Sequence, residues 1–369
     1  MNAPLSPSAP HAPAHAPAAG VRSLLVADDR LFDEHRPRGY HPERPERLGA
    51  VRRALFRAET AGIPAARIAQ RDATLEELYQ AHDRAYVDTL AALSGRETRI
   101  DADTYVGARS VVAARRAAGS AIALVDALLD AEGPPPVGLA LVRPPGHHAT
   151  RDTGMGFCLF NNAAVAAYAA LRRGLSRVAI VDWDVHHGNG TQDIFWDDGR
   201  VLYVSLHQYP FYPGTGAAED VGTGDGKGAT VNIPLSGGAG DAAYSSAFHD
   251  IVEPVLGAFA PELVIVSAGF DAHERDPLAA MRVTSAGYGT LARSIARASQ
   301  ASAKGRVAVL LEGGYDLGAL EDSLFETLTA FTSAPAEHAP IPAFGEVAPG
   351  HRREIADARR VAHRAHRSI

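Results

Sequence analysis

The most constraining feature of this chain is a series of short apolar runs that alternate with longer alanine-rich segments of helical composition. The runs are rich in valine, isoleucine and leucine and have no polar face, which is typical of strands buried on both sides. Strands that alternate with helices in this way form βαβ units and a parallel sheet. We therefore predict an α/β fold: a single domain with one open, mostly parallel sheet and helices on both faces. The runs are Val137–Val142, Val178–Val181, Val201–Leu206, Leu263–Val266 and Val307–Leu311.

The composition divides the chain into three parts. Residues 1–20 are rich in alanine and proline and are predicted to form a disordered tail. Residues 21–340 are predicted to form the folded domain, and residues 341–369 a basic, solvated helical segment. Within the domain we expect a first strand at "VRSLLVADD", a helix that starts after Pro45, and another helix over Ser110–Ala131.

Charge and cysteine content argue against several classes of function. The formal net charge is −7, whereas a dedicated nucleic-acid-binding protein carries a strongly basic surface. Cys158 is the only cysteine, so metal ligands must be histidine, aspartate or glutamate. No stretch reaches the roughly 18 consecutive apolar residues of a membrane span, and the first residues lack the pattern of a secretory signal. We therefore expect a cytoplasmic protein.

Polar sequences follow all five apolar runs, and in open α/β sheets such loops meet at one edge to form a ligand site. The loop after Val181 reads "DWDVHHGNG". If it continues as a strand, Asp182, Asp184 and His186 point to the same side. Carboxylates and imidazoles bind Zn²⁺, but a catalytic zinc ion needs three protein ligands, and Asp271 in "GFDAHERDP" is the best third candidate. Taken alone, an Asp-x-His pair fits a structural hydrogen-bond network equally well.

Two adjacent histidines, His147 and His148, follow the rigid turn "PPG" after another apolar run. A single surface histidine usually has no function. Two adjacent ones at a strand end, opposite a metal-type motif, favour acid–base catalysis over a structural role.

Several motifs together resemble those of the zinc-dependent histone deacetylase superfamily, nearest to its class II branch and to the bacterial deacetylase-like amidohydrolases. These motifs are "RPPGHHA", "DWDVHHGNGTQDIF", "VSLH", "GFDAHERDPL" and "EGGYD". The resemblance runs from about Leu24 to Thr332. It implies an arginase/deacetylase type of sheet and makes residues 21–340 the catalytic domain. It also implies one catalytic Zn²⁺, with Fe²⁺ or Co²⁺ as substitutes, held by Asp184, His186 and Asp271.

The same resemblance implies catalytic roles for five residues. His147 and His148 form the imidazole pair beside the metal. Asp182 accepts a hydrogen bond from His147, and Asn189 faces His148. Tyr315, after "EGG", donates its hydroxyl to the oxygen of the tetrahedral intermediate, a role typically worth about 10²–10³ in rate.

A narrow substrate channel and sites for K⁺ or Na⁺ are also implied by the resemblance. The predicted substrate-binding residues are Arg47 at the inner end, Asp103 at the rim, Gly156, Phe157 and Tyr212 along the walls, and Leu278 at the gate. The predicted monovalent-cation ligands are Asp182, Asp184, His186, Ser205 and Leu206 at an inner site, and Phe195, Asp198 and Val201 at an outer site.

The predicted function is a zinc-dependent amidohydrolase that removes acetyl or other acyl groups from Nε-acyl-lysine by metal-activated water, with His148 as the general base. The predicted partners are an acyl-lysine protein or peptide, or a small acylated amine. We expect no dedicated binding of nucleic acid and no association with a membrane, and self-association is left open. The alternatives are an acetylpolyamine deacetylase and a catalytically silent acyl-lysine binding protein. Apolar Leu278 argues against a polycationic substrate, and intact Tyr315 against a silent protein. Cys158 is read as a buried small residue, and the alanine- and arginine-rich composition suggests a bacterial source.

Overall fold

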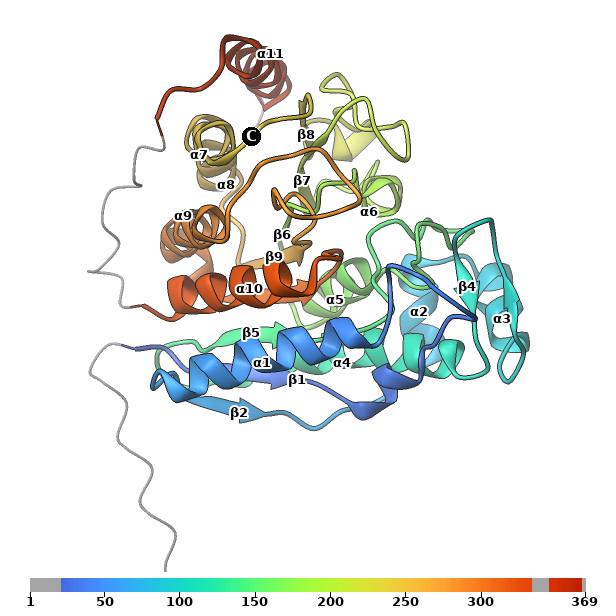
Figure 1. The fold of residues 1–369 in the computed structure, drawn as a ribbon. Coiled ribbons are helices and arrows are strands. Elements are labelled where there is room, and N and C mark those ends of the chain that lie inside the picture. Colours follow the sequence, from blue (N-terminus) through green and yellow to red (C-terminus); the bar gives the residue numbers. More distant parts are fainter. Residues whose placement is uncertain (1–20, 334–344, 367–369) are drawn as a thin grey trace, which may run out of the picture.

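A single parallel sheet organises the protein, whose computed structural model describes residues 21–333 and 345–366. The predicted tail and the predicted boundary at residue 340 lie outside this part. The sheet has eight strands in the order β2-β1-β5-β10-β9-β6-β7-β8, and every neighbouring pair is parallel (Figure 1). The predicted open parallel sheet is therefore confirmed. Its strands are β1 (Leu24–Ala27), β2 (Ala65–Arg67), β5 (Val137–Ala140), β6 (Val178–Asp182), β7 (Val201–Gln208), β8 (Thr230–Leu235), β9 (Leu263–Ala268) and β10 (Val307–Leu311).

All five apolar runs form strands, and every residue of β6, β9 and β10 is buried. Burying one such branched aliphatic side chain contributes about 1.5–3 kcal/mol, which explains why these runs occupy the middle of the sheet. Two edge strands were not predicted. β2 is three residues long and largely exposed, and β8 contains Asn232 and Pro234, which weaken a strand pattern.

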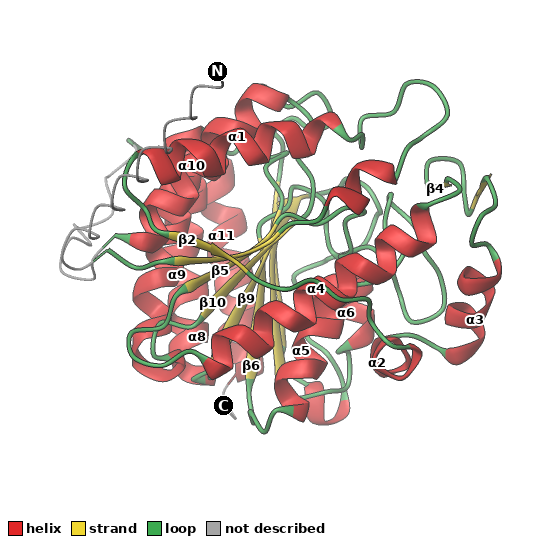
Figure 2. Ribbon diagram, turned by 90° about the horizontal axis from the view of Figure 1, so that it is seen from below, coloured by secondary structure: helices red, strands yellow, loops and turns green. Residues whose placement is uncertain are grey.

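Helices cover both faces of the sheet. α1, α9 and α10 lie on one face and α4 and α5 on the other (Figure 2). α1 starts directly after Pro45, as predicted, and α4 spans nearly the predicted range. The helices before β10 are α1 (Glu46–Thr60), α2 (Leu75–Ala81), α3 (Arg84–Ala92), α4 (Ser110–Asp130), α5 (Asn162–Arg172), α6 (Asn189–Ile194), α7 (Asp241–Ala247), α8 (Glu253–Phe259) and α9 (Ser285–Ala303), and α10 (Leu317–Thr332) follows it. Short elements complete the fold: 3₁₀ helices at Arg30–Glu34 and Gly224–Gly226, a π-helical turn at Phe248–Val252, and an antiparallel pair, β3 (Thr98–Arg99) and β4 (Tyr105–Val106).

The C-terminal segment forms helix α11 (Pro349–Ala365), which packs against the edge strand β8. Its apolar side chains join the main hydrophobic core, and the Ser236 N–H donates to Glu354 Oε2 at 3.1 Å. The prediction of a solvated helix therefore holds for one face only, because the other face covers the sheet edge. No helix in the described residues is long and apolar enough to cross a membrane.

The strand order reverses in the middle of the sheet, and this reversal positions the site. β5 and β6 follow each other along the chain, but β10 and β9 lie between them in the sheet. Loops that leave a parallel sheet on both sides of such a reversal open a crevice at the carboxyl ends of the strands. The loops after β5, β6, β9 and β10 therefore meet at one place.

Candidate active site

Loops from five strands contribute contacting side chains to this place, as predicted. His147 follows β5 and contacts Asp182 at the end of β6. Tyr212 follows β7, and its ring lies 5.2 Å from the ring of His148. Asp271 follows β9, and the loop after β10 carries Tyr315. Residues separated by more than 150 positions are thus brought together at one sheet edge.

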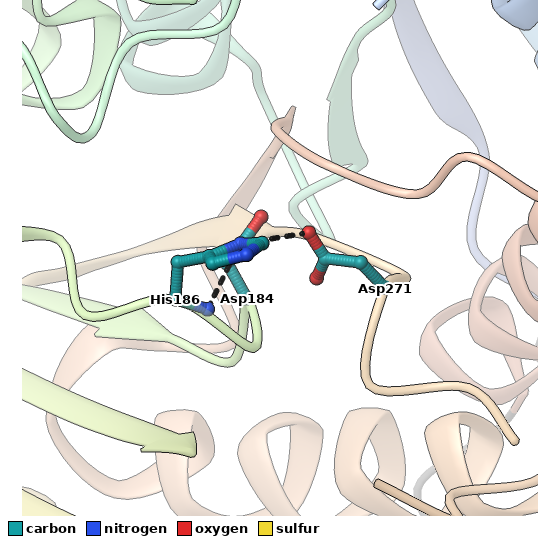
Figure 3. Close-up of side chains that lie close together, drawn as sticks. All are labelled: Asp184, His186 and Asp271. Carbon is teal, nitrogen blue, oxygen red and sulfur yellow. Dashed lines mark hydrogen bonds and ion pairs between the residues drawn. The ribbon is translucent and has the colours of Figure 1, made fainter. Parts of the chain in front are cut away.

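Three side chains form a compact cluster of possible metal ligands, Asp184, His186 and Asp271 (Figure 3). One ligand atom from each lies within 4.8 Å of the others. His186 Nδ1 lies 3.2 Å from Asp184 Oδ1 and 3.3 Å from Asp271 Oδ2. These are the three residues that the sequence predicted as ligands, and two carboxylates with one imidazole are a donor set suited to Zn²⁺ or a related divalent ion.

The two carboxylates of this cluster have no arginine or lysine partner among the described residues. Asp184 and Asp271 are buried, and within residues 21–333 and 345–366 their only ion-pair partners are histidines. Asp271 Oδ2 accepts no hydrogen bond from any described residue. Burial alone would lower the pKa of His186, but Asp184 and Asp271 outweigh it and raise the pKa to about 10. A divalent cation fits here because it would offset two buried negative charges and bind Asp271 Oδ2, which has no hydrogen-bond partner among the described residues.

The ligand loop is shaped by side chains that bind its own backbone. Asp182 Oδ1 accepts from the N–H of Asp184 at 3.1 Å, and Asp184 Oδ1 accepts from the N–H of His186 at 2.9 Å. Asp271 Oδ1 accepts from the N–H of Val185 at 2.9 Å. The prediction that Asp182, Asp184 and His186 lie along one extended strand is therefore wrong, because β6 ends at Asp182 and the loop then turns at each aspartate.

His147 is held by carboxylates on both sides of its ring. Its Nδ1 lies 3.0 Å from Asp182 Oδ2, which also accepts from the Tyr203 hydroxyl, and its Nε2 lies 3.8 Å from Asp184 Oδ1. Burial opposes a charge here, but Asp182 and Asp184 outweigh it and raise the pKa of His147 well above its usual value. The two carboxylates therefore favour the charged form of the His147 ring.

His148 has the opposite electrostatic environment. Burial, together with the neighbouring His147 and His186, lowers the pKa of His148 well below its usual value. Its Nδ1 lies 2.8 Å from Asn189 Oδ1, while Asn189 Nδ2 donates to Met155 Sδ at 3.4 Å. Because a thioether accepts but cannot donate, it keeps the amide oxygen turned toward the ring. Nδ1 of the neutral ring then carries the hydrogen, and Nε2 keeps its lone pair.

Tyr315 follows the two glycines that the sequence placed after β10, and it is 9% exposed. Its ring packs against the edge of Phe157 at 5.9 Å and below the guanidinium of Arg47 at 5.0 Å. Arg47 Nε donates to the carbonyl of Gly314 at 2.7 Å. Gly314 has φ +117°, which a residue with a side chain rarely adopts. The tyrosine is thus presented by a loop that other side chains hold in place.

A buried network of charges connects Arg47 to the loop of the two histidines. Glu43 accepts from Arg47 Nη1 at 3.2 Å and from Arg143 Nη2 at 2.6 Å. Tyr105 donates its hydroxyl to Glu43 at 3.0 Å. Although burial alone would raise the pKa of Glu43, Arg143 and the other partners hold it well below its usual value. Glu312 lies beside this region and accepts from the N–H groups of Gly146 and His147 at 2.6 and 3.2 Å.

The structure places the predicted wall residues beside the candidate catalytic side chains. Tyr212 is 37% exposed and lies 6.1 Å from the ring of His186, while Phe157 contacts Tyr315. Asp103 is exposed, and its carbonyl lies 3.0 Å from Nε2 of His41, whose ring packs on Phe157. Partial burial of the Asp103 carboxyl group, together with the neighbouring Asp101, raises the pKa of Asp103.

Gly156 lies directly against the ring of His148. It has φ +53°, and a Cβ atom at this position would lie 2.3 Å from His148 Cδ2. If His148 is the general base that the sequence predicts, Gly156→Ala should lower kcat on the predicted acyl-lysine substrate by at least about tenfold, because a small displacement of a catalytic group is costly. Gly224→Ala is the matched control, since Gly224 has φ +52° and nothing within 4 Å. Equal losses of activity and equal changes in melting temperature in the two variants would show that backbone strain, and not His148, is responsible.

The two predicted groups of monovalent-cation ligands are each brought together. Asp182 and Ser205 are partners in the β6–β7 ladder, and Asp182 Oδ1 accepts from the N–H of Asp184 in the candidate ligand cluster. In the turn before β7, the N–H of Asp198 donates to the carbonyl of Phe195 at 3.2 Å, and that of Val201 to the carbonyl of Asp198 at 3.3 Å. Occupation by a cation stays a prediction.

Several residues of the site were not predicted from the sequence, namely Glu43, Arg143, Met155, Asp276 and Glu312. Arg143, Asp276 and Glu312 lie in the motifs "RPPGHHA", "GFDAHERDPL" and "EGGYD", whereas Glu43 and Met155 lie outside the motifs quoted above. The available signal was a charged residue inside a motif flanked by proline or glycine. Its partner lies far away along the chain, as for Arg143 and Glu43, which are 100 residues apart.

Comparisons with known proteins identify the family of this chain. A profile of the histone deacetylase domain matches residues 41–331. The chain is 40% identical over 344 residues to "Histone deacetylase 10, chloroplastic" of Oryza sativa subsp. japonica. This match covers 86% of this chain and 78% of the relative. It is 41% identical over 306 residues to a probable deacetylase of Archaeoglobus fulgidus, covering 81% of this chain and 83% of the relative.

A solved structure has the same fold. The crystal structure of the HDA15 HD domain superposes with a TM-score of 0.84 at 39% sequence identity, covering 92% of this chain and 94% of that chain. Because the domain profile, the relatives and the solved structure all agree over most of its length, this chain belongs to the histone deacetylase family of hydrolases.

Proposed function

We propose that this protein is a zinc-dependent amidohydrolase that removes acetyl or other acyl groups from Nε-acyl-lysine in proteins or peptides. The observation that carries the proposal is the cluster of Asp184, His186 and Asp271 next to a neutral His148. Asp184, His186 and Asp271 would hold the ion. When bound, a zinc ion supplies Lewis acidity that polarises the acyl carbonyl and lowers the pKa of water in the site.

The two histidines have different tasks in this mechanism. The neutral His148 takes a proton from the attacking water at Nε2 and later delivers a proton to the departing lysine amine. Asn189 keeps the hydrogen of His148 on Nδ1, so that Nε2 is free to accept. His147 stays protonated between Asp182 and Asp184 and places positive charge next to the reacting carbonyl.

Tyr315 stabilises the developing charge on the substrate. Its hydroxyl donates to the oxygen of the tetrahedral intermediate, where a preoriented donor is worth about 10²–10³ in rate. Phe157 and Tyr212 flank the acyl-lysine side chain, whose methylene groups fit aromatic walls. Cys158 takes no part, because it is fully buried and burial raises the pKa of its thiol well above the usual value. We also propose K⁺ or Na⁺ near Asp182 and Ser205.

One assay panel tests the proposal on enzyme loaded with a single metal. It compares acetyl-lysine peptides, longer acyl-lysine peptides, trifluoroacetyl-lysine peptides and acetylated polyamines. The proposed function predicts the highest kcat/KM on a lysine peptide. A higher value on acetylspermidine would favour the polyamine alternative, and binding of acyl-lysine without turnover would favour a silent binding protein.

Leu278 tests the choice between lysine and polyamine directly. It lies half-buried in the loop after β9 and is proposed to form the gate. We expect Leu278→Glu to raise kcat/KM for acetylspermidine, relative to an acetyl-lysine peptide, by at least about tenfold. A carboxylate a few ångströms from a distal ammonium is worth about 1–4 kcal/mol, and about 1.4 kcal/mol is tenfold in rate. Leu278→Gln is the control for shape without charge, and an unchanged preference in Leu278→Glu would place the determinant elsewhere, with Asp103 the next candidate.

A further inference from the structure

The loop that carries Tyr315 is held by partners on each side. Its carbonyl groups at Glu312 and Gly314 accept from Arg47. The backbone N–H of Gly313 in this loop donates to Asp184 Oδ2 at 2.8 Å. These contacts fix the loop up to Gly314. The peptide of Tyr315 itself needs a further anchor, because Gly314 is the residue at which the loop can swivel.

Asp276 supplies that anchor. Its Oδ2 accepts from the backbone N–H of Tyr315 at 2.6 Å and from that of Asp316 at 3.2 Å. Its Oδ1 accepts from the N–H of Leu278 at 3.0 Å. One carboxylate therefore ties the loop after β9 to the loop after β10, and it connects the gate position to the residue proposed to donate the catalytic hydrogen bond.

The surroundings of Asp276 indicate that this carboxylate serves the backbone and not a cation. Asp276 is 6% exposed and forms no ion pair within residues 21–333 and 345–366. The N–H groups that it binds precede α10, where the helix dipole is electropositive and a negative charge is favourable. Its neighbour Arg275 reaches instead to Asp316 at 3.7 Å.

We propose that Asp276 is a positioning residue that sets the place of the Tyr315 hydroxyl and links it to the gate at Leu278. This role rests on the proposed function, because it acts through Tyr315. Without the carboxylate, the N–H groups of Tyr315 and Asp316 lose a buried acceptor, and the peptide after Gly314 can turn. The hydroxyl then spends less time where the substrate oxygen develops charge.

Asp276→Asn tests the role, because an amide of the same shape offers one acceptor where the carboxylate offers two. On metal-loaded enzyme and an acetyl-lysine peptide, we expect kcat to fall by about 10- to 100-fold, with KM within about twofold of wild type. Metal content should stay at one equivalent. In a Tyr315→Phe background the same substitution should lower kcat by less than about threefold, since the hydroxyl that it positions is already absent.

Glu262→Gln is a matched control for loosening of the fold. Glu262 Oε2 also accepts from two consecutive N–H groups, those of Ser176 and Arg177 at 2.6 and 3.1 Å, but at the start of β9 and far from Tyr315. We expect this variant to keep wild-type kcat at any cost in melting temperature. If Glu262→Gln lowers kcat as much as Asp276→Asn does, the specific role is refuted.

Comparing the hydrolysis rates of two substrates keeps the test valid even if part of the Asp276→Asn protein is unfolded. The rate on a trifluoroacetyl-lysine peptide divided by that on the acetyl peptide is a property of the active molecules alone. We expect this ratio to rise in Asp276→Asn, as it should in Tyr315→Phe, and not to rise further in the double variant. An unchanged ratio, or equal losses of kcat in both backgrounds, would overturn the role of Asp276 alone. A wild-type enzyme that hydrolyses neither peptide would overturn the proposed function as well.

Discussion

Removal of the metal ion is expected to abolish hydrolysis of acetyl-lysine peptides, and addition of Zn²⁺ or Co²⁺ should restore it. We propose Asp184, His186 and Asp271 as the three protein ligands of the ion, which would polarise the substrate carbonyl when bound. The measurement is kcat/KM before and after chelation, with the metal content determined on each sample. Full activity in a sample shown to be free of metal would refute the mechanism.

Metal binding at the same site should also raise the thermal stability of the protein. Without the ion, two buried carboxylates surround a protonated His186. An ion that binds only the folded chain stabilises it by about 4 kcal/mol when its free concentration is about 1,000 times Kd. We therefore expect a higher melting temperature for the loaded protein than for the chelated one, independently of any substrate.

Substitution of single ligands separates metal binding from general damage. Asp184→Asn, His186→Ala and Asp271→Asn should each lose the ion together with activity. Asp182→Asn is the control, because Asp182 is a buried aspartate two residues from Asp184 but binds His147 instead. It should lower the rate while keeping one equivalent of the divalent ion. Ligand variants that retain a full equivalent would show that the ligand assignment is wrong.

Tyr315→Phe is expected to lower kcat on an acetyl-lysine peptide by about 10²-fold or more. The change removes one hydroxyl and leaves the ring packed between Arg47 and Phe157, so folding and metal content should persist. A trifluoroacetyl-lysine peptide should lose less, since its carbonyl is already electrophilic.

Tyr288→Phe is the matched control for this substitution. Tyr288 on α9 is fully buried, and its hydroxyl has no hydrogen-bond partner within the described residues. Removing it should leave kcat unchanged and the melting temperature equal or slightly higher, because an unpaired buried hydroxyl is unfavourable. Near-normal turnover in Tyr315→Phe would mean that Tyr315 only packs.

Much of the fold could be predicted because its central strands carry a local signal. The runs at β6, β9 and β10 are short, and they are apolar throughout because both of their faces are buried. β2 and β8 lack that signal, since an edge strand has fewer buried positions and tolerates polar residues and proline. The buried face of α11 could not be predicted. The basic composition of this helix indicates a solvated surface helix, and only its contact with β8 shows which face is buried.

By itself, the sequence predicted which residues would carry the chemistry: a metal-type motif after β6, paired histidines after β5 and a tyrosine after two glycines all lie in short motifs at strand ends. Only the tertiary structure decided how they are held. Asp182, Asp184 and His186 do not share one extended strand, because β6 ends at Asp182 and the loop then turns at each aspartate. Asp276 meets Tyr315 across 39 residues. Such contacts depend on strand order, which brings together loops that are distant along the chain, and no local pattern of residue types encodes that order.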